Sequence, residues 1–483
     1  MSPFIALFIL ILYFGILLMI AWATSRGANT LTFFTADRKA PWPLVAFGMI
    51  GASISGVTFI SVPGNVGHTD FLYSQVVIGY VIGYIIVASV LMPLYYKLGL
   101  ISIYEYLRDR FGPITYKTGV AYFMVSRTVG SAMRLFLTAG VLQIFIFSGW
   151  GIPFELTVVI TLALIWVYTF KGGIKTIIFT DTFQTTFLVG GALICMWQMA
   201  SQMGNTIEIL ENTLKSRTWF EFSNYKSPMF FLKQIVGGIF ITIAMTGLDQ
   251  DLMQKNLTCP NIRDAQKNMA SFTVILVLVN LIFLTLGALM YDLITYRQIP
   301  LPHSPDLVFP TLALHHLGFI SALFFFLGIT ASSYASADSA LTALTTSFCV
   351  DVLKLQNMDD EKKKSNIKTL VHLGFSVIFI VIILITRQLA DRSLIDIILK
   401  TAGYTYGPLL GFFFFGILTK RSYNDAWAPL ISIAGPIGVA LLDFLAPHWL
   451  HGYKFGFELL LVNGLITYVL LYLSSFLHAK SQT

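Results

Sequence analysis

Thirteen long apolar segments, with only short polar stretches between them, make up most of this chain. A helix needs about 20 apolar residues to cross the hydrocarbon core of a bilayer, and the segments have about that length. Of the 483 residues, 56% are apolar and 11% are charged, whereas a soluble domain has about 25% charged residues. The sequence therefore predicts an all-α integral membrane protein with about 13 transmembrane helices. The predicted segments are 4–23, 41–65, 71–96, 118–147, 152–169, 175–201, 228–248, 269–294, 318–349, 369–386, 393–419, 425–446 and 457–478.

The charges and cysteines argue against several other classes of protein. The net charge of +7 comes from Lys and Arg residues that are scattered over short loops, which argues against nucleic-acid binding. Cys195, Cys259 and Cys349 lie far apart in sequence, and an odd count of three gives no disulfide framework or metal quartet. No metalloprotease, serine-hydrolase or phosphate-binding motif occurs. We therefore expect no catalytic residues, no enzyme activity, no organic cofactor and no obligate protein partner.

The distribution of Lys and Arg predicts the orientation, because cytoplasmic loops carry an excess of positive charge. The basic loops, including 351–368, all face the cytoplasm if the N-terminus lies outside and the C-terminus lies inside. Segment 4–23 follows no positive region and is longer than the apolar core of a signal peptide, so we expect a retained helix. The predicted location is the plasma or inner membrane, with 202–227 outside.

The second apolar segment, GMIGASISGVTFISVPGNVG at 48–67, is unusually rich in glycine and small hydroxyl residues and contains a proline. Irregular backbone at membrane depth is tolerated only beside a cavity or an ion path. The segment therefore predicts a broken helix, whose free carbonyl groups suit a cation and whose exposed amides suit an anion. Close packing of helices through small residues is the alternative interpretation.

The ninth apolar segment carries a line of hydroxyl groups. At 3.6 residues per turn, four of its hydroxyl side chains fall within about a quarter of the helix circumference. Such oxygens suit a hard monovalent cation, although each hydroxyl can instead bond to the carbonyl group four residues earlier. The four residues are Ser332, Ser336, Ser339 and Thr346.

Three ionisable side chains inside apolar segments need partners, because isolated charge in a bilayer is costly. Asp181 either binds a cation or pairs with Arg127 or Lys400. Arg127 and Arg134 are seven residues apart and so lie on one face of a helix. An arginine there meets either an internal carboxylate or a carboxylate of the substrate, which the guanidinium group fits well.

These features favour secondary transport over other membrane functions. The sequence contains no nucleotide-binding motif of a primary pump. A broken helix with a polar cluster at the membrane midplane is more typical of alternating access than of a continuous pore. An ion channel and a proton-coupled transporter are the alternatives from other classes.

Five motifs in order along the chain resemble the sodium:solute symporter family, which includes sodium-coupled sugar, proline and sialic acid transporters. The motifs are GASISGVTFISVPG, GGIKTIIFTDTFQ, GLDQDLMQKNL, ASADSALTALTTSFCVDVL and AGYTYGPLLGFFFFGILTKR. The resemblance implies a leucine-transporter-like fold of two five-helix units with inverted topology. The implied division is an extra N-terminal helix and loop at 1–40, a first repeat at 41–201, an extracellular loop at 202–227, a second repeat at 228–419, and C-terminal helices at 420–483.

The resemblance also implies a sodium site between the first helix of one repeat and the third helix of the other. Its ligands would be the backbone carbonyl groups of Gly51, Ile54 and Ser332 and the hydroxyl group of Ser336. One position departs from the family pattern, because Ala335 replaces a second hydroxyl residue. A water molecule, Ser333 or Ser339 could substitute for it.

Some family members bind a second sodium ion. In this chain Asp181 and Ser339 match two of its ligands. The neighbouring position is Asp338, which lies about 100° around the helix from Ser339. We therefore expect Asp338 to point away from the site, toward Arg127.

The substrate positions that the resemblance implies surround the broken helix. Arg134 is similar to an arginine that holds the substrate carboxylate in the sialic acid branch, and a structural salt bridge is the alternative role. The resemblance therefore implies a sodium-coupled symporter that imports a small carboxylate, such as a sialic-acid-like sugar acid, with a neutral sugar, polyol or amino acid as the alternative. The implied substrate-binding residues are Thr58, Phe59, Ser61, Gln75, Arg134, Tyr404 and Tyr406.

Overall fold

A computed structural model describes residues 3–387 and 394–482, and every regular element in these ranges is a helix. The helices of at least six residues are α1 (Pro3–Thr24), α2 (Thr30–Thr35), α3 (Trp42–Ser53), α4 (Gly56–Thr69), α5 (Tyr73–Ile86), α6 (Met92–Leu98), α7 (Glu105–Arg110), α8 (Pro113–Leu142), α9 (Phe154–Thr169), α10 (Ile174–Met203), α11 (Thr206–Lys215), α12 (Phe231–Thr242), α13 (Gln250–Asn256), α14 (Ile262–Arg297), α15 (Val308–His315), α16 (Phe319–Ser347), α17 (Glu361–Arg387), α18 (Leu394–Leu418), α19 (Ala428–Trp449) and α20 (Leu459–Gln482).

Each of the thirteen apolar segments coincides with a long helix or with a bent pair of helices. Within the described ranges, ten helices are long and apolar enough to cross a membrane, and two bent pairs raise this number to twelve. The remaining predicted segment, 152–169, is the 16-residue apolar helix α9. The prediction of an all-α membrane protein is therefore confirmed.

The first bent pair is the broken helix that the sequence predicts. Helix α3 ends at Ser53, Ile54 and Ser55 are extended, and α4 begins at Gly56 after a bend of 63°. The second bent pair was not predicted as a break. Turn Ile243–Gly247 extends α12, and α13 begins after Asp249 with a bend of 70°. The side chain of Asp249 caps α13 by accepting a hydrogen bond from the amide of Asp251.

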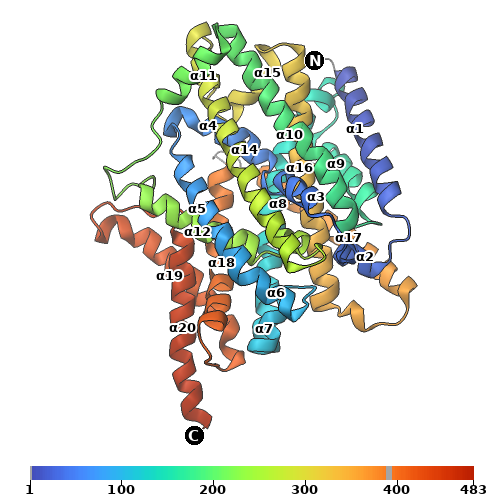
Figure 1. Cartoon of the computed structure of the whole chain (residues 1–483), viewed down its shortest axis with the longest axis vertical. Helices are drawn as coiled ribbons and strands as arrows, with labels where there is room; N and C mark the ends of the chain where they lie inside the picture. Colours follow the sequence, from blue (N-terminus) through green and yellow to red (C-terminus); the bar gives the residue numbers. More distant parts are fainter. Residues whose placement is uncertain (1–2, 388–393, 483) are drawn as a thin grey trace.

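The two broken helices lie inside the bundle. Helix α3 packs against α10, α14 and α16, and α12 packs along α5. Helix α1 lies along one edge of the bundle, and α19 and α20 lie on the opposite side (Figure 1). This arrangement brings the two breaks, which are about 190 residues apart in sequence, to the walls of one internal cavity.

Candidate functional site

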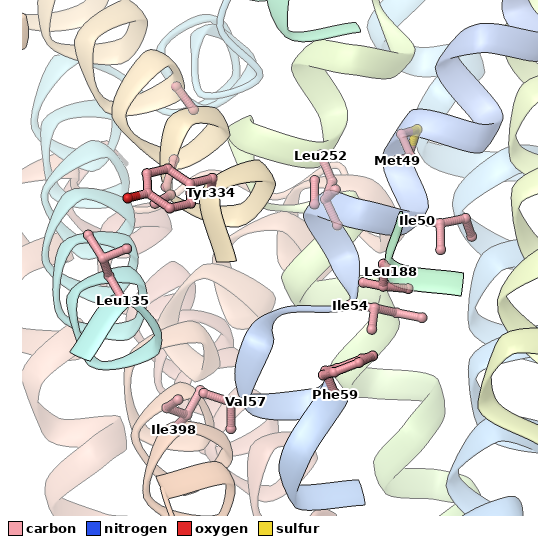
Figure 2. Packing of buried hydrophobic residues seen from close by; sticks show 14 of the residues in the cluster. Met49, Ile50, Ile54, Val57, Phe59, Leu135, Leu188, Leu252, Tyr334 and Ile398 are labelled. Atoms are coloured by element: carbon pink, nitrogen blue, oxygen red, sulfur yellow. The ribbon is translucent and has the colours of Figure 1, made fainter. Parts of the chain in front are cut away.

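A cavity lies between the two broken helices. Its walls come from the α3–α4 break and from α5, α8, α12, α13, α14 and Ile398 of α18. Val57 points toward Ile398, whereas Phe59 points to the other side of the broken helix, toward Leu188 of α10 (Figure 2). One face of α4 therefore faces the cavity, and the opposite face belongs to the apolar core.

Arg134 of α8 lines this cavity. Its side chain is partly exposed, and no hydrogen bond or ion pair joins it to any residue that the structure describes. Arg127, two turns earlier, also lines the cavity, but its guanidinium group pairs with Asp251 and lies 3.8 Å from Asp249. The cavity therefore contains one arginine that is neutralised by the protein and one that is free to meet an anion.

The second broken helix supplies the carboxylates that neutralise Arg127. The hydroxyl group of Tyr406 donates to Asp249, and that of Ser339 donates to Asp251. Sequence reasoning assigned no function to these two aspartates. The signal that could have predicted the second break is the GLD sequence at 247–249. A glycine favours an interruption of a helix, and an aspartate is a common N-cap of a new one.

The two breaks differ in how their carbonyl groups are satisfied. The carbonyl oxygens of Gly247 and Leu248 accept hydrogen bonds of 2.9 and 3.0 Å from Tyr95 and Tyr104. At the first break, no described residue donates to the carbonyl group of Gly51 or Ile54. A helix end leaves such carbonyl groups available, so the first break can bind a cation.

Helix α16 brings hydroxyl groups to the first break. A β-carbon at Gly51 would lie 3.3 Å from that of Ala335, and one at Gly56 would lie 2.0 Å from Oγ of Ser333. The hydroxyl oxygens of Ser333 and Ser336 are buried and have no hydrogen-bond partner among the described residues. The side chain of Ser332 bonds within its own helix, to the carbonyl oxygen of Ile329 at 3.5 Å. Ser333 and Ser336 are therefore the available hydroxyl groups beside the break.

Asp181 has a partner that lies between two predicted apolar segments, 228–248 and 269–294. Its carboxylate forms an ion pair with Lys255 of α13, and both side chains are buried. The predicted pairing with Arg127 is wrong, since Arg127 pairs with Asp249 and Asp251. The side chain of Lys400, the other predicted partner, lies outside the described residues.

Asp338 also has a different partner from the expected one. Its carboxylate accepts a hydrogen bond of 2.6 Å from Tyr168 of α9. The predicted contact with Arg127 is therefore wrong.

Four of the implied substrate-binding residues have other contacts and do not line the cavity. Phe59 is fully buried in a cluster of phenylalanine rings. Ser61 donates to Asp306 at 2.6 Å. The side chain of Gln75 forms hydrogen bonds with the backbone of Glu221 and Met229. The hydroxyl group of Tyr404 donates to Asp443 at 3.3 Å.

Three implied residues are at or near the cavity. Thr58 and Arg134 line it directly. Tyr406 lies in a small side pocket that Arg127 and Arg134 share. Sequence reasoning missed Tyr73, Tyr80 and Tyr84, which form one cavity wall on α5; their spacing of seven and four residues marks one face of a helix.

Comparison with known proteins identifies the family. The profile of the sodium:solute symporter family matches residues 33–430, which is most of the chain. The chain belongs to the sodium:solute symporter family. The resemblance found in the motifs is therefore confirmed, and so is sodium coupling as the function of the class.

Individual relatives of this symporter transport carboxylates. It is 24% identical over 424 residues to the sodium/sialic acid symporter SiaT of Proteus mirabilis, covering 84% of this chain and 83% of that one. It is 25% identical over 436 residues to sodium-coupled monocarboxylate transporter 1 of Homo sapiens, and the match covers 87% of this chain and 69% of that one.

A solved structure has the same fold as this symporter. A Na⁺-coupled sialic acid symporter in a substrate-bound, outward-open state superimposes with a TM-score of 0.83 at 20% identity, over 98% of both chains. The predicted leucine-transporter-like fold and the multi-pass membrane location are therefore confirmed.

Proposed function

We propose that this protein imports a small organic carboxylate together with sodium, and that Arg134 binds the carboxylate group. The observation that carries the proposal is that Arg134 lines the cavity and has no hydrogen bond or ion pair with the described residues. A buried or half-buried cation without an internal partner favours an anion in its site. The named substrates of the relatives, sialic acid and monocarboxylates, support this proposal because they are carboxylates.

The proposed sodium site lies at the first break. The carbonyl groups of Gly51 and Ile54 form one half of it, and the carbonyl group of Ser332 with the hydroxyl group of Ser336 forms the other. The free carbonyl groups and the unpaired Ser336 hydroxyl support this arrangement. Ser333 is the hydroxyl residue that compensates for Ala335, since its hydroxyl group lies beside the break and has no partner among the described residues.

Sodium couples to transport because its ligands come from two helices. A ligand shifts a conformational equilibrium only through its different affinities for the two states. Sodium that bridges α3 and α16 therefore stabilises the state in which these helices are close. Inward opening separates the ligands and releases the ion, driven by the sodium gradient. The membrane potential contributes only for net charge that moves in the cycle, at about 2.3 kcal/mol per charge per 100 mV.

We further propose the topology that the sequence implies. Residues 41–201 and 228–419 are the two inverted repeats, 1–40 and 420–483 are additions at the ends, and 202–227 is extracellular. The N-terminus lies outside and the C-terminus inside, in the plasma or inner membrane. The protein acts as a transporter and not as an enzyme.

Thermal stability of the purified protein tests the function first, because binding to the folded state raises stability. The protein is heated in sodium and in potassium, and then in sodium with sugar acids, monocarboxylates, neutral sugars and amino acids. We expect a sodium-specific rise in melting temperature that a carboxylate enlarges. Stabilisation by a neutral sugar or amino acid alone would contradict the Arg134 proposal, and folded protein without any sodium effect would contradict the sodium site.

A further inference from the structure

Lys255 is an unusual residue for a membrane transporter because its charged end is buried inside the bundle. Only 1% of its side chain is exposed, and it extends from α13, the short second half of the second broken helix. Lysine is almost never fully buried unless it is paired. Its Nζ atom pairs with Oδ2 of Asp181 on α10, whose side chain is 0% exposed.

A second carboxylate faces this ion pair from a third helix. Asp338 of α16 is fully buried and lies within electrostatic range of both Asp181 and Lys255. Its Oδ2 atom accepts the hydrogen bond from Tyr168, while its Oδ1 atom has no partner among the described residues. One oxygen of Asp181 is likewise without a hydrogen bond. Two carboxylates thus share the environment of one ammonium group.

We propose that Lys255 is a built-in cation that occupies the place a sodium ion would take at Asp181, so that this protein binds one sodium ion and not two. This inference rests on the proposed function, since it presumes the sodium site at the first break. A sodium ion at Asp181 would lie at contact distance from the Lys255 ammonium group, and two cations so close repel strongly where water is scarce. The hydroxyl group of Ser339, the other residue implied for a second ion, is directed by its hydrogen bond toward Asp251 and not toward Asp181.

One consequence concerns the charge that moves in each transport cycle. One sodium ion with one monovalent carboxylate carries no net charge, whereas two sodium ions with the same carboxylate carry one positive charge. The lysine is part of the chain and is not released, so it neutralises Asp181 in every state without using the sodium gradient. Transport of a monocarboxylate is then electroneutral.

The direct test counts sodium ions with ²²Na⁺ alone, which requires no knowledge of the substrate. Purified, folded protein is equilibrated with ²²Na⁺ over a range of concentrations, and bound ions are counted per protein molecule. We expect one ion with a Hill coefficient near one. Two ions per molecule overturn the inference and leave the proposed function standing, whereas no bound ion overturns the proposed function itself.

Two substitutions of Lys255 separate charge from space. Lys255→Ala leaves both carboxylates and opens room beside them, so we expect a second ²²Na⁺ ion to bind. Lys255→Met removes the charge but fills most of the space with an apolar chain, so we expect one ion. Lys255→Ala protein that still binds one ion would show that the ammonium group is not what excludes sodium, and would overturn the inference.

A double variant is the control in case the single variants misfold, because each single variant leaves Asp181 as a buried, uncompensated charge. Lys255→Met with Asp181→Asn removes both charges together. We expect it to bind one ²²Na⁺ ion with the half-saturating concentration of the unmodified protein, within about twofold. A tenfold higher concentration would mean that Asp181 is a sodium ligand, and would overturn the inference.

Discussion

Gly56 lies so close to Ser333 that a β-carbon at position 56 would fall 2.0 Å from the serine hydroxyl oxygen. The start of α4 therefore touches the hydroxyl face of α16, at the level where two serine hydroxyl groups have no partner among the described residues. This contact joins the free carbonyl groups of the first break to the oxygens that complete a cation site. Other hydroxyl groups on α16 do bond within the protein, as Thr345 and Thr346 bond to carbonyl groups of their own helix.

Replacing the hydroxyl group of Ser336 should weaken sodium binding. A hydrogen bond or ligand contact to a charged group contributes about 1.5–3 kcal/mol, so Ser336→Ala should raise the half-saturating sodium concentration by about 10-fold or more. Ser333→Ala should act in the same direction if Ser333 compensates for Ala335. Sodium titration of thermal stability and of uptake measures both effects.

Ser376 provides a matched control for these variants. It is a buried serine on α17 whose hydroxyl group bonds to the carbonyl oxygen of His372 in its own helix, at 2.9 Å. Ser376→Ala should leave the sodium titration unchanged. An unchanged titration in Ser336→Ala as well would remove Ser336 from the site.

Substitution of the two arginines of α8 should have different effects: loss of substrate affinity at Arg134 and loss of stability at Arg127. Arg134→Gln removes a cation that has no ion pair within the described chain, so the protein should fold with a similar melting temperature. Its affinity for a carboxylate substrate should fall by about 10- to 100-fold, and Arg134→Lys should recover only part of it because a point charge replaces a planar fork. Uptake and substrate-dependent thermal shifts measure these losses.

Arg127→Gln is the comparison, because it leaves the buried carboxylates of Asp249 and Asp251 without their cation. Breaking a buried ion pair on one side costs about 3–5 kcal/mol, so this variant should lose folded protein in detergent. If Arg134→Gln loses folded protein to the same extent, Arg134 has a structural role and the substrate proposal fails.

Helices α5 and α12 touch at glycines, and this contact should not tolerate a methyl group. A β-carbon at Gly79 would lie 2.2 Å from the carbonyl oxygen of Ile235, and one at Gly238 would lie 2.3 Å from that of Val76. Backbone atoms cannot move aside as a side chain can, and overpacking typically costs about 1–3 kcal/mol. Gly79→Ala and Gly238→Ala should each lower the melting temperature.

Gly190 of α10 is the control for the α5–α12 contact, since a β-carbon there would meet nothing within 4 Å. Gly190→Ala should leave stability unchanged or raise it slightly, because alanine is the better helix former. Equal destabilisation by all three substitutions would show that the effect does not come from the α5–α12 contact.

The sequence predicts the helical architecture well because the bilayer imposes a simple length rule. It also indicates the first break, where glycine, proline and hydroxyl residues interrupt an apolar run. The sequence does not predict the second break. The apolar segment ends at Leu248, and the charged residues after it are typical of a cytoplasmic loop. The structure instead buries Lys255 at 1% exposure.

The ion-pair partners in the site could not be predicted from the sequence. Asp181 and Lys255 are 74 residues apart, and several other charges were equally plausible partners by position alone. Arg134 is free only because Arg127 takes both aspartates of the second break. Which of two arginines remains available depends on the packing of α8 against distant helices, and no local pattern carries that information.

The proposed orientation predicts which surface residues a membrane-impermeant maleimide can reach. All three native cysteines are buried, so an introduced cysteine should dominate labelling in intact cells. Ser223 and Ser365 are both exposed, the first in the 202–227 loop and the second near the start of α17. Ser223→Cys should react from outside, whereas Ser365→Cys should react only after the cells are opened. Protein without an introduced cysteine sets the background, and the reverse pattern of labelling would place the N-terminus in the cytoplasm and exchange the two sides of the transport cycle.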